Sequence, residues 1–230
     1  MKRFWKVAAV VAARDDYGIE LDRRPLKTPA RVALAVPTRD LADAIAAEWN
    51  GSGETIDPRT MPLTGLANAA IDRVAPDPAT FAAGLARYAE ADLFAYRAKG
   101  PGRLVAQEAA EWDPLLAWAW RRFDVDFVIT DSILHAPQPP ATIARLAHAV
   151  AALDPFLLAA LSPLVTIGGS LVAALALVED AAPFDTIWSA VSLDERWQIE
   201  QWGDDAEAVA SLANRRADYD AAARFIRLLH

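Results

Sequence analysis

The longest uncharged stretch of the chain, residues 156–178, limits its fold more than any other feature. It is long enough to span a bilayer. However, Pro163 and the pair Gly168-Gly169 interrupt it, and charged residues close it at both ends. A membrane helix would have to tolerate all of these helix breakers, whereas two shorter helices would not. The stretch therefore predicts two buried helices joined within residues 164–169, and it argues against membrane insertion.

The first part of the chain has the pattern of a small antiparallel sheet. Residues 4–11 are mostly apolar, residues 15–18 have the composition of a turn, and residues 19–21 return the chain. Apolar and polar residues then alternate over residues 32–36, as is typical of a half-buried strand. Together these segments predict an antiparallel meander.

Helices are predicted to follow this sheet. Thr38 can cap the first of them and Thr64 the second. Pro76 marks a change in composition, after which helical patterns dominate. We therefore expect an α+β fold with two domains. Residues 1–76 form a small N-terminal α/β layer with antiparallel strands and helices, and residues 77–230 form a larger all-helical domain.

The acidic composition of the chain argues against several classes of function. The net charge is −8 at pH 7, and the sequence pI is about 4.9. A nucleic-acid partner would require a basic surface to neutralise phosphates, so none is expected. The chain has no cysteine, which removes disulfides, thiol catalysis and thiolate metal sites. Its three histidines lie far apart in the sequence, so no histidine-rich metal site is expected.

The first residues of the chain resemble a secretory signal, because three basic side chains occur with an apolar run. The run is short, ends at Ala13 and is followed by charged residues. We interpret this segment as a first strand. An amphipathic, Arg-rich transit segment is also absent, which favours the bacterial cytoplasm as the compartment.

Residues 193–207 combine two tryptophans with six carboxylates. Ser192 and Glu195 have the spacing of a capping box, in which each side chain bonds the backbone N–H of the other residue. Gly203 is a natural left-handed stop, and Asp204-Asp205 can begin another helix. The segment therefore predicts a helix of about two and a half turns, a tight break and a long last helix.

Capping leaves part of this segment unexplained. It accounts for Glu195, but not for Trp197, Gln198 and Glu200. Aromatic residues beside charges are typical of protein-binding surfaces. The simpler interpretation is that the acids cap helices and the tryptophans are core residues. Trp197 and Trp202 are five residues apart, so they point to different sides of one helix.

A second candidate segment, residues 92–97, ends a helical stretch before a loop rich in glycine and proline. Asp92 and Arg97 could belong to a site, although an ion pair that anchors the loop is the simpler alternative. The chain lacks HExxH, a DxDxDG loop and a Ser-His-Asp order with a supporting glycine signature. The residues alone therefore give no support for catalysis.

Short segments in order along nearly the whole chain resemble one known family. In the first half they are Arg3-Phe4-Trp5-Lys6, Leu21-Asp22, Pro25-Leu26-Lys27-Thr28-Pro29, Val36-Pro37-Thr38, Glu48-Trp49, Met61-Pro62-Leu63-Thr64, Ala70-Ile71-Asp72, Asp92-Leu93, Tyr96-Arg97, Gln107 and Trp112-Asp113-Pro114-Leu115. In the second half they are Gly169-Ser170, Leu193-Asp194-Glu195, Trp197-Gln198, Glu200, Trp202-Gly203 and Asp205. This pattern is similar to that of the assembly chaperones of the ATP synthase catalytic head that act on the alpha subunit.

The resemblance implies a small α/β layer followed by a helical domain, and a role without catalysis. Such a chaperone binds the free alpha subunit of ATP synthase and shields its interface until the beta subunit takes its place. It is a monomer when free and needs no nucleotide, metal or other cofactor. Eukaryotic relatives act in the mitochondrial matrix. An unassembled subunit exposes apolar surface that promotes aggregation, so a chaperone must cover that surface and later release it.

We expect the binding face to include these residues: Glu195, Trp197, Gln198, Glu200 and Asp205, with Asp92 and Arg97 adjoining. The alternative is an enzyme that acts on a small cationic or polar substrate through carboxylates such as Asp92 and Glu195. A deep pocket that joins those two acids would favour the enzyme, whereas a shallow groove would favour the chaperone.

Overall fold

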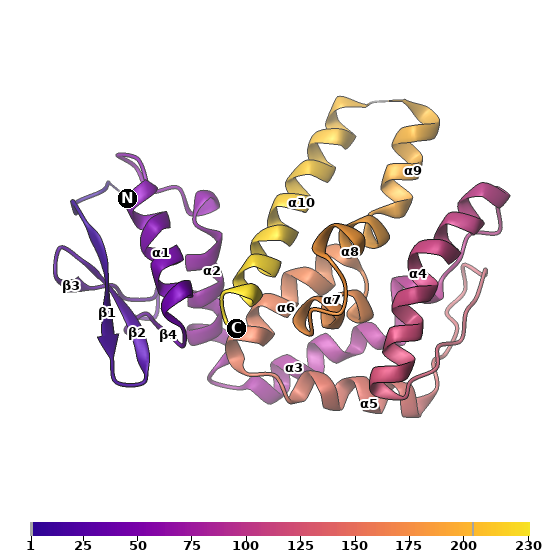
Figure 1. Ribbon diagram of the computed structural model, residues 1–230, viewed down its shortest axis with the longest axis horizontal. Coiled ribbons are helices and arrows are strands. Elements are labelled where there is room, and N and C mark those ends of the chain that lie inside the picture. The colour runs from indigo at the N-terminus through magenta and orange to yellow at the C-terminus, as the bar shows by residue number, and fades with distance from the viewer. Residues whose placement is uncertain (1, 204) are drawn as a thin grey trace. The chain divides into compact units, whose positions relative to one another are not determined.

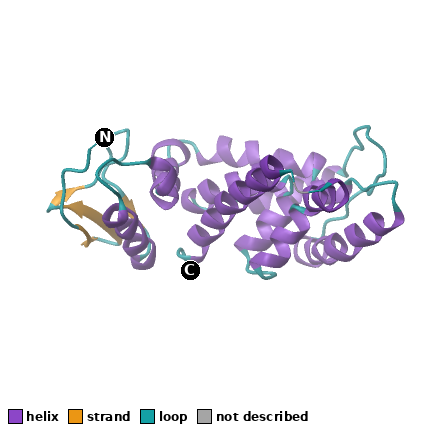
Figure 2. Cartoon of the chain, turned by 90° about the horizontal axis from the view of Figure 1, so that it is seen from above, coloured by secondary structure: helices purple, strands orange, loops and turns teal. Residues whose placement is uncertain are grey.

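The computed structural model describes residues 2–203 and 205–230. It has the expected α+β fold, with a small antiparallel sheet and its helices followed by a largely helical region (Figure 2). The chain groups into two compact units. The first comprises residues up to Pro78, Asp154–Ala160 and Arg224–His230, and the second comprises Ala79–Leu153 and Leu161–Ala223.

Two strands form the body of the sheet in the first unit (Figure 1). β1 (Ala8–Ala13) pairs antiparallel with β2 (Asp16–Leu21) along its full length. The short strands β3 (Arg24–Pro25) and β4 (Ala35–Val36) both pair with β2 as well. The turn lies between Ala13 and Asp16, and not at residues 15–18 as expected, because Asp16 is already paired with Ala13.

Helix α1 (Arg39–Gly51) packs against this sheet through its apolar stripe. Its start is as predicted, since the Thr38 hydroxyl accepts a hydrogen bond from the Leu41 N–H at 3.3 Å. Near its end, the Trp49 ring lies against Trp5, with ring centroids 4.9 Å apart. The core of this unit is therefore built from both the sheet and the helix.

Helix α2 (Pro62–Ala69) continues into a π-helical turn, Ala70–Val74. Thr64 does not cap it, contrary to the sequence prediction, because the helix begins two residues earlier. The carboxylate of Glu48, from α1, accepts hydrogen bonds from the Leu63 and Thr64 N–H groups, both at 2.8 Å. A side chain distant in sequence therefore occupies the position expected for a local cap.

The rest of the chain is largely helical, with an irregular connection over residues 124–139. Its α-helices are α3 (Pro78–Ala86), α4 (Gly102–Phe123), α5 (Pro140–Ala151), α6 (Pro155–Gly168), α7 (Leu171–Val178), α8 (Phe184–Val191), α9 (Leu193–Trp202) and α10 (Ala206–Arg227). Two 3₁₀ turns, Arg87–Ala91 and Leu93–Ala95, precede α4. Among the described residues, no helix has the length and apolarity needed to cross a membrane.

The uncharged stretch forms α6 and α7, as predicted, but their junction differs from the expected one. α6 continues through Pro163 and ends at Gly168. A proline inside a helix costs about 3 kcal/mol. Complete burial of Leu161 and Leu164, on either side of Pro163, offsets this cost. Ser170 then caps α7, since its hydroxyl accepts a hydrogen bond from the Ala173 N–H at 3.0 Å.

Candidate partner-binding site

Helices α9 and α10 form a hairpin (Figure 1). Gly203 ends α9 with a φ of +91°, and its N–H donates to the Ile199 carbonyl at 3.0 Å. Asp205 caps α10 by accepting from the Glu207 N–H at 3.0 Å. Asp204, the other expected first residue, lies outside the described residues. The short helix, tight break and long last helix follow the sequence prediction, and residues 206–211 of α10 are all exposed.

The predicted capping box at the start of α9 is not formed. The Ser192 hydroxyl donates to the Trp188 carbonyl at 2.6 Å, and no side chain caps α9 through Ser192. The reason is that α8 ends at Val191, immediately before Ser192. Ser192 therefore satisfies the end of α8, and the Glu195 carboxylate is left to find another partner.

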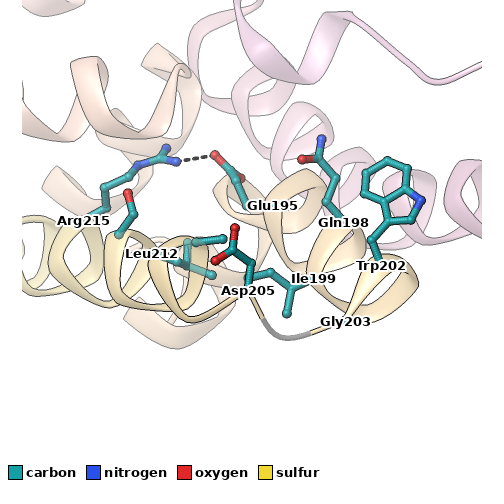
Figure 3. Close-up of a pocket in the computed structure, with 10 residues that line it drawn as sticks. Glu195, Gln198, Ile199, Trp202, Gly203, Asp205, Leu212 and Arg215 are labelled. Carbon is teal, nitrogen blue, oxygen red and sulfur yellow. Dashed lines mark hydrogen bonds and ion pairs between the residues drawn. The ribbon is translucent and has the colours of Figure 1, made fainter.

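An open groove runs between the two helices of the hairpin and has a volume of about 500 Å³. Figure 3 shows the residues that line it. They are Glu195, Gln198, Ile199, Trp202, Gly203, Asp205, Ala208, Ser211, Leu212 and Arg215. The groove thus combines acids, an amide and apolar side chains from both helices, all within the second unit.

An ion pair crosses the groove. The guanidinium of Arg215, on α10, pairs with the carboxylate of Glu195, on α9 (Figure 3). Arg215 also donates to the carbonyl of Ile167 at 2.7 Å, so α6 holds it in place. Both charged side chains are only half-buried. Glu195 is therefore fixed by a salt bridge that remains accessible to solvent, and nearby Asp194 has its pKa raised, first by burial and then by the Glu195 charge.

Three of the predicted site residues line this groove: Glu195, Gln198 and Asp205. Two others on α9, Trp197 and Glu200, do not. Trp197 is 9% exposed, and the Arg103 guanidinium lies 5.3 Å from its ring centroid. Arg103 also forms an ion pair with Glu200 at 2.7 Å.

These contacts place Trp197 and Glu200 against α4. Trp202, five residues after Trp197, is 80% exposed. The expectation that the two tryptophans point to different sides is therefore confirmed.

Asp92 and Arg97 do not form the ion pair that the sequence suggested. Asp92 is fully buried and accepts hydrogen bonds from the Phe94 N–H at 3.1 Å and the Val172 N–H at 3.0 Å. Arg97 pairs instead with Asp113 at 2.6 Å. Its guanidinium also lies 5.0 Å from the ring centroid of Trp112. Both residues hold the fold, as the simpler alternative expected, but each uses another partner.

Burial raises the pKa of the Asp92 carboxyl to about 6, although its hydrogen bonds to backbone N–H groups oppose this shift. Its charge contributes to a raised pKa of Tyr219, for which burial is the larger cause. Asp92 does not line the groove that contains Glu195. The two carboxylates that the enzyme alternative required are therefore not brought together there.

The predicted site residues left out seven others that line the groove: Ile199, Trp202, Gly203, Ala208, Ser211, Leu212 and Arg215. Trp202 could have been included, because its five-residue spacing from Trp197 places it on another side of α9. Arg215 and Leu212 had no local signal, since their place depends on how α10 folds back along α9. Among the described residues, no cluster of three or more His, Asp or Glu side chains is placed to hold a metal ion.

The pattern of the chain matches a known family model. That model, described as ATP12 chaperone protein, matches residues 2–120, just over half of the chain. The chain belongs to the ATP12 chaperone family. It is thus a chaperone of ATP synthase assembly and not an enzyme, as the resemblance implied.

Individual relatives of this ATP12 family member match it over its whole length. The crystal structure of Atp12 from Paracoccus denitrificans is 41% identical with a TM-score of 0.93, and the match covers 100% of this chain and 98% of that one. A chaperone candidate from Agrobacterium tumefaciens is 36% identical with a TM-score of 0.94, covering 100% and 86%. Protein atp12, mitochondrial, of Schizosaccharomyces pombe is 24% identical over 245 residues, covering 100% and 84%. The similarity therefore includes the α9–α10 hairpin, which lies beyond the family model's match.

Proposed function

We propose that this ATP12 family chaperone binds the free alpha subunit of ATP synthase and shields its interface until the beta subunit replaces it. The α9–α10 groove is the binding face. The main support for the proposal is the side chain of Trp202, which lines the groove and is 80% exposed. A large exposed indole beside apolar groove walls is the kind of anchor that supplies most of the energy of a protein interface.

The charges around the groove suit a partner that must be captured and then released. The chain has a net charge of −8, and Asp205 and Glu207 are both exposed at the start of α10. Acidic groups at a rim accelerate encounter with a complementary surface more than they strengthen the final complex. An interface of standard size, about 800 Å² per partner, would extend well beyond this groove.

The predicted site residues take different roles in this proposal. Glu195, Gln198 and Asp205 contact the alpha subunit directly. Trp197, Glu200 and Arg97 keep α9 and α4 in position beside that contact. Asp92 is fully buried, so it supports the helical unit from within and does not touch a partner.

Co-purification of the alpha subunit with variants of the chain tests the proposal. Trp202→Ala should abolish capture or weaken it at least tenfold, because the anchor is lost. Glu195→Lys should also weaken it, since it places a second cation beside Arg215. Glu90→Lys changes the charge equally at an exposed position of the same unit, outside the groove, and should bind as the wild type does.

Circular dichroism and urea unfolding must show that each variant is folded. Capture of the alpha subunit by folded Trp202→Ala and Glu195→Lys at wild-type affinity would count decisively against the groove. A wild-type chain that does not capture the alpha subunit at all would overturn the proposed partner.

A further inference from the structure

The connection between α4 and α5 contains a segment, residues 126–130, that is hydrogen-bonded at alternate residues from one side. The Thr142 hydroxyl donates to the Asp126 carbonyl at 2.7 Å and accepts from the Asp126 N–H at 3.2 Å. The side-chain amide of Gln138 donates to the Val128 carbonyl at 3.1 Å and accepts from the Val128 N–H at 2.8 Å. Each of these side chains thus bonds both backbone groups of one residue.

Thr130 continues the pattern two residues further on. Its N–H donates to the Ala95 carbonyl at 2.9 Å, and its carbonyl accepts from the Arg97 N–H at 2.8 Å. These bonds form a parallel bridge between Thr130 and Tyr96. Bonding at every second residue is the pattern of a strand in a sheet. Residues 126–130 are therefore extended and paired along one edge, although side chains supply two of the three partners.

The opposite edge of this segment is open. In an extended chain the N–H and C=O groups of successive residues point to opposite sides, so those of Phe127 and Ile129 point away from the bonded edge. Within residues 2–203 and 205–230, neither backbone makes a hydrogen bond. Neither residue is buried, and unpaired backbone groups outside the core bond to water. The segment therefore presents the free edge of a strand, to which another strand can add.

The side chains along this edge indicate which strand would fit. Val128 and Ile129 are 45% and 48% exposed, so each offers apolar surface to a neighbouring strand. Asp126 and Asp131 are exposed on either side of them. Pairs of apolar side chains and pairs of opposite charge across neighbouring strands are both stabilising. A complementary segment would therefore have β-branched residues in its middle and basic residues at its ends.

A second copy of the chain does not fit this description. It would bring its own Asp126 and Asp131 to the same edge, and like charges on neighbouring strands are destabilising. Exposed charges are one of the means by which proteins prevent edge strands from pairing with themselves. The edge thus favours a strand from a different protein.

We propose that residues 126–130 bind an extended segment of the alpha subunit of ATP synthase by adding it as a strand, with its basic side chains beside Asp126 and Asp131. This inference rests on the proposed function and goes beyond it, because it assigns a contact outside the α9–α10 groove. In strand addition, main-chain hydrogen bonds supply affinity and side chains supply specificity. The two contacts reinforce each other, because the second forms at the high effective concentration set by the first.

A first test follows backbone amide exchange by NMR while the peptide acetyl-Lys-Val-Thr-Val-Lys-amide is added. Strand addition should slow exchange at Phe127 and Ile129 about tenfold near saturation. Exchange at Val128 and Thr130, whose N–H groups are already bonded inward, should change little. The acidic peptide acetyl-Glu-Val-Thr-Val-Glu-amide is the control and should alter none of them. Equal slowing at all four residues, or none at Phe127 and Ile129, overturns the proposal.

A second test uses Ile129→Pro, which removes an N–H from the open edge. The bonds of Val128 and Thr130 remain possible, because the residue before a proline favours an extended conformation. The affinity for the alpha subunit should fall about tenfold in this variant. Ile129→Val keeps the N–H and should bind as the wild type does. Should urea unfolding show that Ile129→Pro does not fold, Asp126→Lys decides: it should also weaken capture, whereas Glu90→Lys should not.

The outcomes distinguish this inference from the proposed function. Folded Ile129→Pro and Asp126→Lys variants that capture the alpha subunit at wild-type affinity overturn the edge and leave the proposed partner intact. A wild-type chain that captures no alpha subunit overturns the proposed partner and this occupant together, even where the peptide adds as a strand. Slowed exchange at Phe127 and Ile129 that depends on the concentration of the chain alone identifies a second copy as the occupant, and it overturns the proposal as well.

Discussion

The carboxylate of Asp92 accepts a hydrogen bond from the backbone N–H of Val172, 3.0 Å away and 80 residues further along the chain. It thereby completes the start of α7, beside the cap that Ser170 provides. A carboxylate at a helix start is electrostatically favourable, but here it is fully buried. Burial dominates, and it raises the pKa of Asp92 from the ordinary 3.8 to about 6.

This raised pKa predicts a specific dependence of stability on pH. Between pH 3.8 and about 6 the folded chain binds a proton at Asp92 that the unfolded chain does not. The contribution of this group to the free energy of unfolding is therefore largest below pH 3.8 and falls as the pH rises to about 6. The loss amounts to about 3 kcal/mol.

Urea unfolding from pH 4 to pH 7 tests this prediction. The quantity to follow is the difference in free energy of unfolding between the wild type and Asp92→Asn at each pH. The asparagine cannot ionise, so wild-type stability relative to the variant should decrease steadily over that range. The interpretation is wrong if the difference between the two proteins does not change with pH.

Gly168 is expected to tolerate no side chain. A Cβ there would lie 3.2 Å from Tyr219 Cε2 and 3.3 Å from Val191 Cγ1. Both neighbours are buried, so neither can move aside freely. Gly168→Ala should lower the free energy of unfolding by about 1–3 kcal/mol. Gly84→Ala has open space and should instead raise it by up to about 1 kcal/mol; equal effects of the two changes, measured by urea unfolding, would contradict this account.

Substitution of the two tryptophans of α9 should have different effects, one on stability and the other on binding of the alpha subunit. Trp197 packs under Arg103 and is buried, so Trp197→Ala should cost about 3–5 kcal/mol of stability. Trp202 is exposed, so Trp202→Ala should change stability by less than about 0.5 kcal/mol. Urea unfolding measures the stability of both variants. Co-purification of the alpha subunit measures binding, which Trp202→Ala should weaken. A large destabilisation by Trp202→Ala would show that this indole packs within the chain.

Glu48 should stabilise the first unit through α2. Its carboxylate accepts hydrogen bonds from two N–H groups at the start of that helix. Glu48→Ala should therefore lower stability by about 1–2 kcal/mol, the cost of a lost helix cap. Glu54→Ala removes a carboxylate from an exposed position in the same unit and serves as the control. Urea unfolding of both variants checks the prediction, which fails if the control is equally destabilised.

Features that depend on nearby residues could be predicted from the sequence. The Thr38 cap, the Gly203 stop and the two helices of the uncharged stretch are set by the chain's own local geometry, and all three occur. Local composition also predicted the first hairpin turn, although it was expected at residues 15–18 and lies between Ala13 and Asp16. These elements were sufficient to predict the α+β fold.

Where a distant side chain competed with a local one, the sequence prediction was wrong. The Trp188 carbonyl takes the Ser192 hydroxyl away from the capping box and Glu195 pairs with Arg215. Glu48 replaces Thr64 as a cap, and Asp113 replaces Asp92 as the partner of Arg97. Arg215, Glu48 and Asp113 became neighbours of these residues only through tertiary folding. The groove was therefore predicted in part: Glu195, Gln198 and Asp205 were identified, whereas Leu212 and Arg215 of its α10 wall were not.

Because the first turns of α10 are exposed, amide hydrogen exchange in them should differ between the free and the client-bound protein. Residues 206–211 bury little within the chain, and short helical segments without such burial are marginal in water. Their amide hydrogens should exchange with deuterium rapidly in the free protein. A client lying across the hairpin would slow that exchange, so isotope uptake at this one helix end would distinguish a loaded chaperone from an empty one.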